Sequence, residues 1–183
     1  MDDPRTLPRW RGDLAIRTFL PWLTAILVVI ADRITKSWVL EHLETGAWRP
    51  VMSGVALTHV HNRGIAFSLF ADGGPLSRML LHGVILGAVV LIAWMLFRHA
   101  SRRPVAGLAF GLILGGAVGN LIDRILYGWV IDFVHLWVRL GGHTWSWPDF
   151  NVADAAITVG ALLLIISELF TKPTKEADAS DAD

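Results

Sequence analysis

Cysteine is absent from the 183-residue chain, which excludes disulfide bonds, thiolate metal sites and a cysteine nucleophile. Charged residues are scarce at 17%, whereas hydrophobic residues make up 54%, a balance too apolar for an ordinary soluble domain of this length. Equal numbers of basic and acidic residues give a formal net charge of zero, without the basic excess typical of nucleic-acid binding. The composition therefore predicts a membrane protein that does not bind nucleic acid.

Several catalytic motifs are also missing. The sequence contains no HExxH zinc motif, no G-x-S-x-G elbow and no phosphate-binding glycine loop. His59 and His61 are the nearest approach to a metal-binding pair, but their i, i+2 spacing is more typical of one face of a polar strand. Lys36 adjoins Ser37, yet adjacent helical side chains point in divergent directions, which argues against a serine–lysine dyad. We therefore predict no metal and no cofactor.

Four apolar stretches are long enough to cross a bilayer, which takes roughly 17 to 25 helical residues. They run from Phe19 to Leu40, Met79 to Phe97, Val105 to Ile122 and Val152 to Phe170. The first carries Asp32 and Lys36 and lacks a small-residue cleavage site after it, so we expect a retained span rather than a secretory signal. The polar tail, 173–183, is predicted to be disordered, and 1–172 to form one membrane-embedded domain.

The distribution of Lys and Arg predicts the orientation of the spans. Basic residues crowd one set of span ends: Arg5, Arg9, Arg11, Arg17, Arg98, Arg102, Arg103, Lys172 and Lys175. The long connections, about 41–78 and 126–150, hold far fewer. Because basic residues favour the cytoplasmic side, both termini should be cytoplasmic and the long connections outside. Tryptophans, which prefer the membrane interface, gather at the predicted outer boundary: Trp38, Trp48, Trp129, Trp137, Trp145 and Trp147.

Local patterns predict structure in the outer connections and a contact between spans. Residues 55–61 and 65–70 are β-prone runs separated by the turn sequence at 62–64, which predicts a small hairpin on the membrane surface. Residues 135–147 mix aromatics with glycine and are predicted to form a short interfacial helix. Small residues recur every four positions in the third span, at Gly107, Gly111, Gly115 and Gly119, and favour close helix packing. The predicted fold is all-α, with four transmembrane helices, a small hairpin and an interfacial helix.

Ionisable residues inside spans cost about 2.5 to 3.5 kcal/mol each at a helix centre, so each needs an explanation. The candidates are Asp32, Arg33, Lys36, Asp123, Arg124, Asp132, Asp154 and Glu168. All but Glu168 lie near or just beyond the predicted outer ends of the spans, which would place them in one layer. Such a layer is the strongest indication of a functional site in the sequence.

Most of these residues have a partner nearby in the sequence. Asp32 with Lys36, and Glu168 with Lys172, have the i, i+4 spacing of helical ion pairs. A structural role explains Glu168 well, whereas Asp32 fits a structural or a functional role equally. A polar clamp between helices is expected from three residues on one helical face: Asn120, Asp123 and Arg124.

Asp132 and Asp154 differ because neither has a basic residue within one helical turn of sequence. Both lie in apolar surroundings, and Asn151 stands one turn before Asp154. Burial without a countercharge raises the pKa of a carboxyl, and two carboxylates held close together cannot both ionise readily. Such a pair can supply one general base and one general acid for hydrolysis of an amide. The residues alone leave open whether these two carboxyls meet in the fold.

The sequence resembles the bacterial lipoprotein signal peptidases, also called signal peptidase II, over nearly its whole length. Five blocks carry the resemblance: DRITK at 32–36, NRGIAFS at 62–68, GAVGNLIDR at 116–124, VIDF at 130–133 and FNVAD at 150–154. Each block alone is weak evidence, but five in order on a four-span chain are specific. The one departure is mild, since the family more often has Ala where Ile65 stands.

The resemblance implies a membrane aspartic endopeptidase of the bacterial cytoplasmic membrane, with Asp132 and Asp154 as its catalytic dyad. Its substrate would be a diacylglyceryl-modified prolipoprotein, cut just before the lipidated cysteine at the extracytoplasmic face. Residues implied to bind substrate, position the dyad or support the site are Asn62, Gly64, Asn120, Arg124, Asn151, Asp32, Lys36 and Asp123. Membrane lipids would be the other partners of a monomeric enzyme.

Two rival functions remain at this stage. A small transporter or channel also uses intramembrane carboxylates, although a relay should cross the membrane rather than stop at one side. A scaffold that packs its glycine stripe against a partner helix would need no catalytic carboxyl, but would fail when Gly111 or Gly115 is enlarged.

Overall fold

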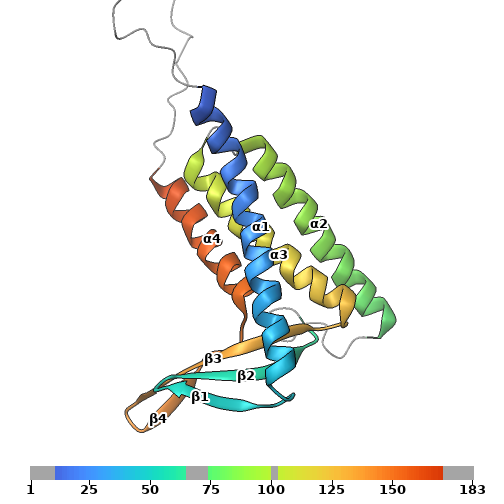
Figure 1. Ribbon diagram of the computed structural model, residues 1–183, viewed down its shortest axis with the longest axis vertical. Coiled ribbons are helices and arrows are strands. Elements are labelled where there is room, and N and C mark those ends of the chain that lie inside the picture. Colours follow the sequence, from blue (N-terminus) through green and yellow to red (C-terminus); the bar gives the residue numbers. More distant parts are fainter. Residues whose placement is uncertain (1–10, 65–73, 100–102, 171–183) are drawn as a thin grey trace, which may run out of the picture.

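The computed structural model describes residues 11–64, 74–99 and 103–170, and within them four long helices (Figure 1). These helices are α1 (Arg11–His42), α2 (Pro75–His99), α3 (Pro104–Leu126) and α4 (Val152–Leu169). Each contains a segment long and apolar enough to cross a membrane: Arg17–His42, Met79–Arg98, Pro104–Leu126 and Val152–Leu169. The predicted multi-pass architecture is confirmed, and the predicted span ends differ from the observed ones by four residues at most.

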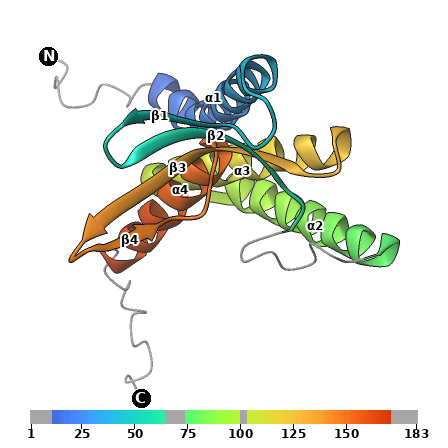
Figure 2. The same ribbon diagram turned by 90° about the horizontal axis from the view of Figure 1, so that it is seen from below.

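A four-stranded antiparallel sheet lies at one end of the helix bundle (Figures 1 and 2). Its strands, in spatial order, are β1 (Trp48–Met52), β2 (Val55–Asn62), β3 (Val130–Leu140) and β4 (His143–Ser146). The start of α1 and the end of α4 lie at the opposite end of the bundle (Figure 1). The expectation of an all-α fold is therefore wrong in part, because both long connections contribute strands.

The predicted interfacial helix at 135–147 is wrong. These residues form the end of β3, a turn and β4. The turn contains Gly141 and Gly142 with φ angles of 58° and 80°, which suit a two-residue hairpin turn that few side chains tolerate. In the other connection, 55–61 is the predicted strand, but it pairs with β1 and β3. Its expected partner, 65–70, lies outside the described residues.

Glycine residues of α3 let two helices approach it closely. A Cβ atom at Gly115 would lie 2.6 Å from the Ala25 carbonyl oxygen of α1, and one at Gly119 would lie 2.7 Å from a carboxylate oxygen of Asp32. On another face of α3, a Cβ at Gly116 would collide with the main chain of Ala153 in α4. The predicted packing role of the stripe is confirmed at Gly115 and Gly119, which lie against α1, whereas Gly116, which lies against α4, is not one of the stripe residues.

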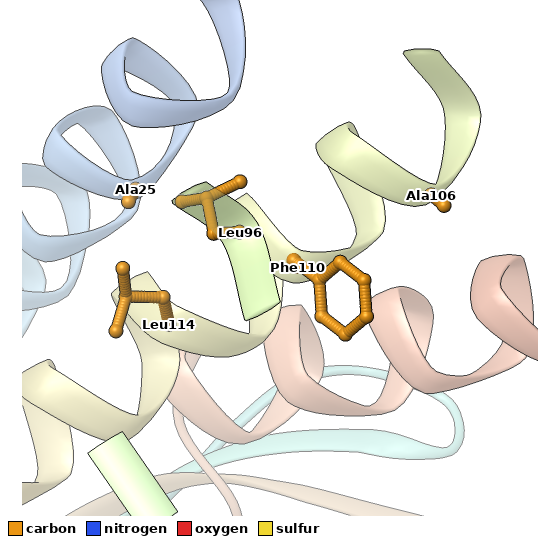
Figure 3. Packing of buried hydrophobic residues seen from close by; sticks show 5 residues of the cluster. All are labelled: Ala25, Leu96, Ala106, Phe110 and Leu114. Atoms are coloured by element: carbon orange, nitrogen blue, oxygen red, sulfur yellow. The ribbon is translucent and has the colours of Figure 1, made fainter. Parts of the chain in front are cut away.

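Two apolar clusters hold the helices and the sheet together. Three helices, α1, α2 and α3, contribute the first cluster (Figure 3): Ala25, Leu96, Ala106, Phe110 and Leu114. The second lies between the end of α1 and β3: Val39, Leu43, Ile131 and Phe133. Because Ile131 and Phe133 flank Asp132, burial of these two side chains fixes the position of that aspartate at the end of the bundle.

Candidate active site

Lys36 is the centre of a buried polar network between α1 and α3. Its ammonium lies 2.8 Å from an Asp32 oxygen, 2.9 Å from an Asp123 oxygen and 3.0 Å from Asn120 Oδ1. The side chains of Lys36, Asp32 and Asp123 are fully buried, so the two carboxylates need positive partners, which are Lys36 for both and Arg33 in addition for Asp123. The two carboxylates also receive main-chain N–H groups, from Ala153 at Asp32 and from Ile131 at Asp123. The network thereby ties α1 to both segments that carry the candidate catalytic aspartates.

Asn120 transmits this network to Asp154. Its Oδ1 accepts from Lys36 at 3.0 Å and from Asn151 Nδ2 at 3.2 Å. With the oxygen occupied by two donors, its Nδ2 faces Asp154 and donates to Oδ1 at 2.8 Å. Asn120 therefore points its amide group, and not its oxygen, at the Asp154 carboxylate.

Asn151 is the residue that joins the two candidate aspartates. As the N-cap of α4 it accepts from the Asp154 main-chain N–H at 2.9 Å, and its own main-chain N–H donates to Asp154 Oδ2 at 3.2 Å. This reciprocal arrangement is a capping box. The Asn151 side chain also donates to Asp132 Oδ1 at 2.7 Å. One buried asparagine thus contacts both carboxyl groups, and the structure places Asp132 and Asp154 in one site.

The remaining predicted residues, Asn62 at the end of β2, Gly64 just after it and Arg124 of α3, join the same network. Asn62 Nδ2 donates to Asp132 Oδ2 at 3.0 Å, while Asn62 Oδ1 accepts from the Gly64 main-chain N–H at 3.1 Å. Arg124 donates to the Gly64 carbonyl oxygen at 2.8 Å and to the Asn120 carbonyl oxygen at 3.3 Å. All ten residues expected from the sequence therefore lie in one connected network, although this placement does not test their individual roles.

Asp132 has the electrostatic character expected of an acid–base group. The pKa of Asp132 is raised from 3.8 to about 7, mainly by burial and also by the nearby Asp154 carboxylate, although the amides of Asn62 and Asn151 and the charge of Lys36 act to lower it. Because burial outweighs the amide hydrogen bonds, Asp132 retains a proton up to near neutral pH. A carboxyl with a pKa near neutrality can release or take up a proton under physiological conditions.

A cavity of about 1220 Å³ opens beside the two aspartates. Polar residues lie at the sheet end of its lining, among them Asn62, Arg124, Asp132 and Asp154. Residues from the faces of α2, α3 and α4 line the remainder, and most are aliphatic: Val84, Ile85, Ala88, Ala117, Ile157 and Val159. The cavity can therefore hold an apolar chain and a polar reacting group together.

The charged contacts expected from the sequence can be compared with those of the structure. Asp123 pairs with Arg33 and Lys36 of α1. Glu168 pairs with Arg103 at 2.7 Å, while Lys172, its expected partner, lies outside the described residues. The polar clamp between α1 and α3 is confirmed for Asn120 and Asp123, but Arg124 bonds to Gly64 instead.

His59 and His61 do lie on a strand, as predicted. They contact one another through their Nε2 atoms at 3.2 Å, and His59 Nδ1 lies 2.8 Å from the Leu43 carbonyl oxygen. Burial lowers the pKa of His61, and the neighbouring His59 and Arg63 lower it further. Within the described ranges, no three or more His, Asp or Glu side chains are grouped in a way that could hold a metal ion.

The sequence reasoning missed a second polar cluster beside the site. Asp149 Oδ1 accepts from Thr58 Oγ1 at 2.7 Å and from His135 Nδ1 at 3.1 Å. Asp149 is two residues before Asn151, and an acidic residue directly before the FNVAD block was the available signal. This acidic residue alone does not indicate a cluster, because its partners Thr58 and His135 come from strands that are distant in the sequence.

The comparisons with known proteins decide the family. A family model described as signal peptidase (SPase) II matches residues 24–170. The chain belongs to the signal peptidase II family. A lipoprotein signal peptidase of Cupriavidus necator is 45% identical over 162 residues, covering 88% of this chain and 90% of that protein. A second relative of that name, from Pseudoalteromonas atlantica, is 42% identical over 79% of this chain and 85% of its own length.

Solved structures support the membrane architecture of this signal peptidase II family member. A bacterial membrane enzyme determined by the in meso method at 2.3 Å resolution has a TM-score of 0.72 and 26% identity, covering 90% of this chain and 94% of that one. A second such structure, at 1.9 Å resolution, has a TM-score of 0.71 and 27% identity. As a signal peptidase II, the chain is a peptidase, and its cluster of carboxyl and amide side chains is the candidate active site.

Proposed function

We propose that the chain is an aspartic endopeptidase that removes the signal peptide from diacylglyceryl-modified prolipoproteins, cutting just before the lipidated cysteine. Its relatives are named lipoprotein signal peptidases. The single observation that carries the aspartic mechanism is the contact of Asn151 with both Asp132 and Asp154. Two buried carboxyls tied to one amide residue meet the requirement for an acid and a base in one site.

In the proposed reaction, Asp154 is the general base and Asp132 the general acid. Asp154 takes a proton from water as the water oxygen attacks the scissile carbonyl carbon. Asp132, whose pKa of about 7 keeps it protonated below neutral pH, gives its proton to the leaving amide nitrogen as the C–N bond breaks. The products are a carboxylic acid and an amine, and transfer of one proton between the two aspartates restores the starting state.

The supporting residues have separate proposed roles. Asn120 and Asn151 hold the Asp154 carboxylate by donating to both of its oxygens. Asn62 and Asn151 orient Asp132, and Gly64 orients Asn62 through its main-chain N–H. Arg124 lines the cavity and donates to the Gly64 carbonyl oxygen, so we assign it to substrate binding. Lys36 pairs with Asp32 and Asp123 and donates to Asn120, so these three charged residues hold Asn120 in position.

The position of the site suits a lipid-anchored substrate. Acyl chains keep such a substrate in the bilayer and bring its scissile bond no deeper than the headgroup level. The two aspartates lie where the helices meet the sheet, and the apolar lining of the cavity continues along α2 and α4, where acyl chains would lie. By the distribution of Lys and Arg, we place the sheet at the extracytoplasmic face and both termini in the cytoplasm of a bacterial cell.

A transporter or channel is less well supported. The fully or nearly buried charged side chains of the described segments are Asp32, Lys36, Asp123, Arg124 and Asp132, and all lie at the sheet end. Glu168 and Arg103, at the other end of the bundle, are both about half exposed. In the part of the chain that the structure describes, these residues form no chain of ionisable groups from one face of the membrane to the other.

The purified protein in detergent should cleave a diacylglyceryl-modified prolipoprotein peptide at the bond preceding the lipidated cysteine. Mass spectrometry of the products identifies the bond, and the same peptide without its lipid is the matched control. Because two carboxyls supply the acid and the base, treatment with a chelator should leave the rate unchanged. Loss of cleavage of the lipidated peptide on chelation would refute the proposed mechanism. Failure to cleave the lipidated peptide under all conditions tested would refute it as well.

A further inference from the structure

Asp149 connects three segments next to the candidate active site. Its Oδ1 accepts hydrogen bonds from Thr58 in β2 and from His135 in β3, at 2.7 Å and 3.1 Å. Thr58 is almost completely buried, and the His135 ring packs against Trp48 with ring centroids 4.6 Å apart. Thr58 and His135 are thus held in place by contacts that do not involve Asp149. They can therefore fix the position of Asp149 and of the segment around it.

A β-bulge explains why Thr58 can reach Asp149. Leu57 pairs with Val134 and Val60 pairs with Asp132, so two residues of β2, Thr58 and His59, lie opposite one residue of β3. An inserted residue of this kind changes the direction of the neighbouring side chains. Thr58 bonds to Asp149, while His59 contacts the Leu43 carbonyl oxygen at the end of α1.

The chain between Asp149 and Asp154 is attached to β3 at Phe150 and Asn151. The Phe150 carbonyl oxygen accepts from Phe133 and Val134 at 3.1 Å and 2.8 Å, and the Phe150 N–H donates to Val134 at 3.1 Å. Asn151 then donates to Asp132 and caps α4. This short segment therefore connects Asp149 to Asn151, which contacts both the Asp132 and the Asp154 carboxyls.

We propose that Asp149 is a positioning residue of the peptidase, which fixes the spacing of the two catalytic carboxyls by accepting hydrogen bonds from Thr58 and His135. The inference rests on the proposed function, since Asp132 and Asp154 must carry out the chemistry. Both interactions need an acceptor oxygen at this position, and an asparagine oxygen serves as well as a carboxylate oxygen. The role of Asp149 is accordingly one of geometry and not of charge.

Direct contact with substrate is the competing role, because Asp149 also lines the cavity. The two roles differ in their kinetic effect. A lost substrate contact raises KM, whereas displacement of the catalytic carboxyls lowers kcat and leaves KM unchanged. A displacement of about 1 Å can lower the rate by up to about 100-fold.

Cleavage of the lipidated peptide in detergent should be measured for Asp149→Ala, Asp149→Asn and Thr58→Val, each with its thermal unfolding midpoint. We expect the Ala and Val variants to lose about 10- to 100-fold in kcat with KM within about twofold, and the Asn variant to recover most of kcat. A raised KM with normal kcat, a normal kcat in Asp149→Ala, or an Asn variant as impaired as the Ala variant would overturn the proposal.

Two controls keep the result interpretable. If Asp149→Ala does not fold, Thr58→Val and Asp149→Asn decide by the same criteria, because both conserve side-chain size. Asp154→Asn, measured beside them, tests the proposed function separately. Full activity of Asp154→Asn would refute the dyad whatever the Asp149 variants do, whereas an inactive Asp154→Asn with an unaffected Asp149→Ala would refute only the positioning role.

Discussion

Replacement of either proposed catalytic aspartate, Asp132 or Asp154, by asparagine should lower kcat by about 100- to 10,000-fold, without preventing the protein from folding. An amide has nearly the same shape as a carboxylate but can neither accept a proton from water nor donate one to the leaving nitrogen at neutral pH. Asp154→Asn removes the proposed base, and Asp132→Asn removes the proposed acid. The measurement is single-turnover cleavage of the lipidated peptide, with the thermal unfolding midpoint recorded for each variant.

Glu168→Gln is the matched control for these variants. It makes the same chemical change at an exposed carboxylate that pairs with Arg103 at the opposite end of the bundle. We expect its kcat to remain within about twofold of the wild-type value, because an exposed ion pair contributes only about 0 to 1 kcal/mol. Cleavage by Asp132→Asn or Asp154→Asn at the rate of Glu168→Gln would exclude the dyad and return the carboxyls to a structural role.

Lys36→Met should cause the largest loss of stability of any single substitution in the site, about 3 to 5 kcal/mol. The change removes the ammonium that lies within 2.9 Å of both Asp32 and Asp123 and leaves two buried carboxylates with too little positive charge. Asp123 keeps its ion pair with Arg33, so Asp32 carries most of the penalty. Unfolding in detergent, followed by circular dichroism against denaturant, gives the change in free energy.

Two further variants separate charge from packing at Lys36. Adding Asp32→Asn to Lys36→Met removes one uncompensated charge, so the double variant should be more stable than Lys36→Met alone. Arg103→Gln breaks the exposed ion pair with Glu168 and should cost no more than about 1 kcal/mol. If Lys36→Met unfolded at the same denaturant concentration as Arg103→Gln, the buried network would not support the site as described.

The helices and several of the site residues could be predicted because their signals are local, whereas Asn62 and Gly64 were expected in the site only from the family resemblance. Apolar stretches of the length needed to cross a bilayer mark the spans, and the cost of burying charge makes residues such as Lys36 and Asp123 conspicuous. Asn151 and Asp154 stand three residues apart, the spacing of a capping box. Each of these features depends only on a few neighbouring residues or on the thickness and polarity of the membrane. The structure therefore agrees with them.

The sheet and the Asp149 cluster depend on contacts between distant segments. The strand pairing of β2 with β3 joins residues about 70 positions apart, such as Asn62 with Val130. The Gly141-Gly142 pair is typical of a hairpin turn, but the aromatic residues on both sides of it favour an interfacial helix when the sequence is considered alone. The bulge at Thr58 has no signal in its own sequence, because it is defined by the pairing with β3.

The central claim is that Asp132 is the general acid beside the general base Asp154, and titration of the Asp132 carboxyl tests this claim most directly. Carbon-13 NMR of protein labelled at the aspartate carboxyl carbons can follow it in detergent, with the resonance assigned by its loss in Asp132→Asn. We predict a midpoint near pH 7 in the wild-type protein, and a lower midpoint in Asp154→Asn, where the neighbouring charge is gone. A wild-type midpoint near the ordinary value of 3.8, or one that Asp154→Asn leaves unchanged, would contradict it.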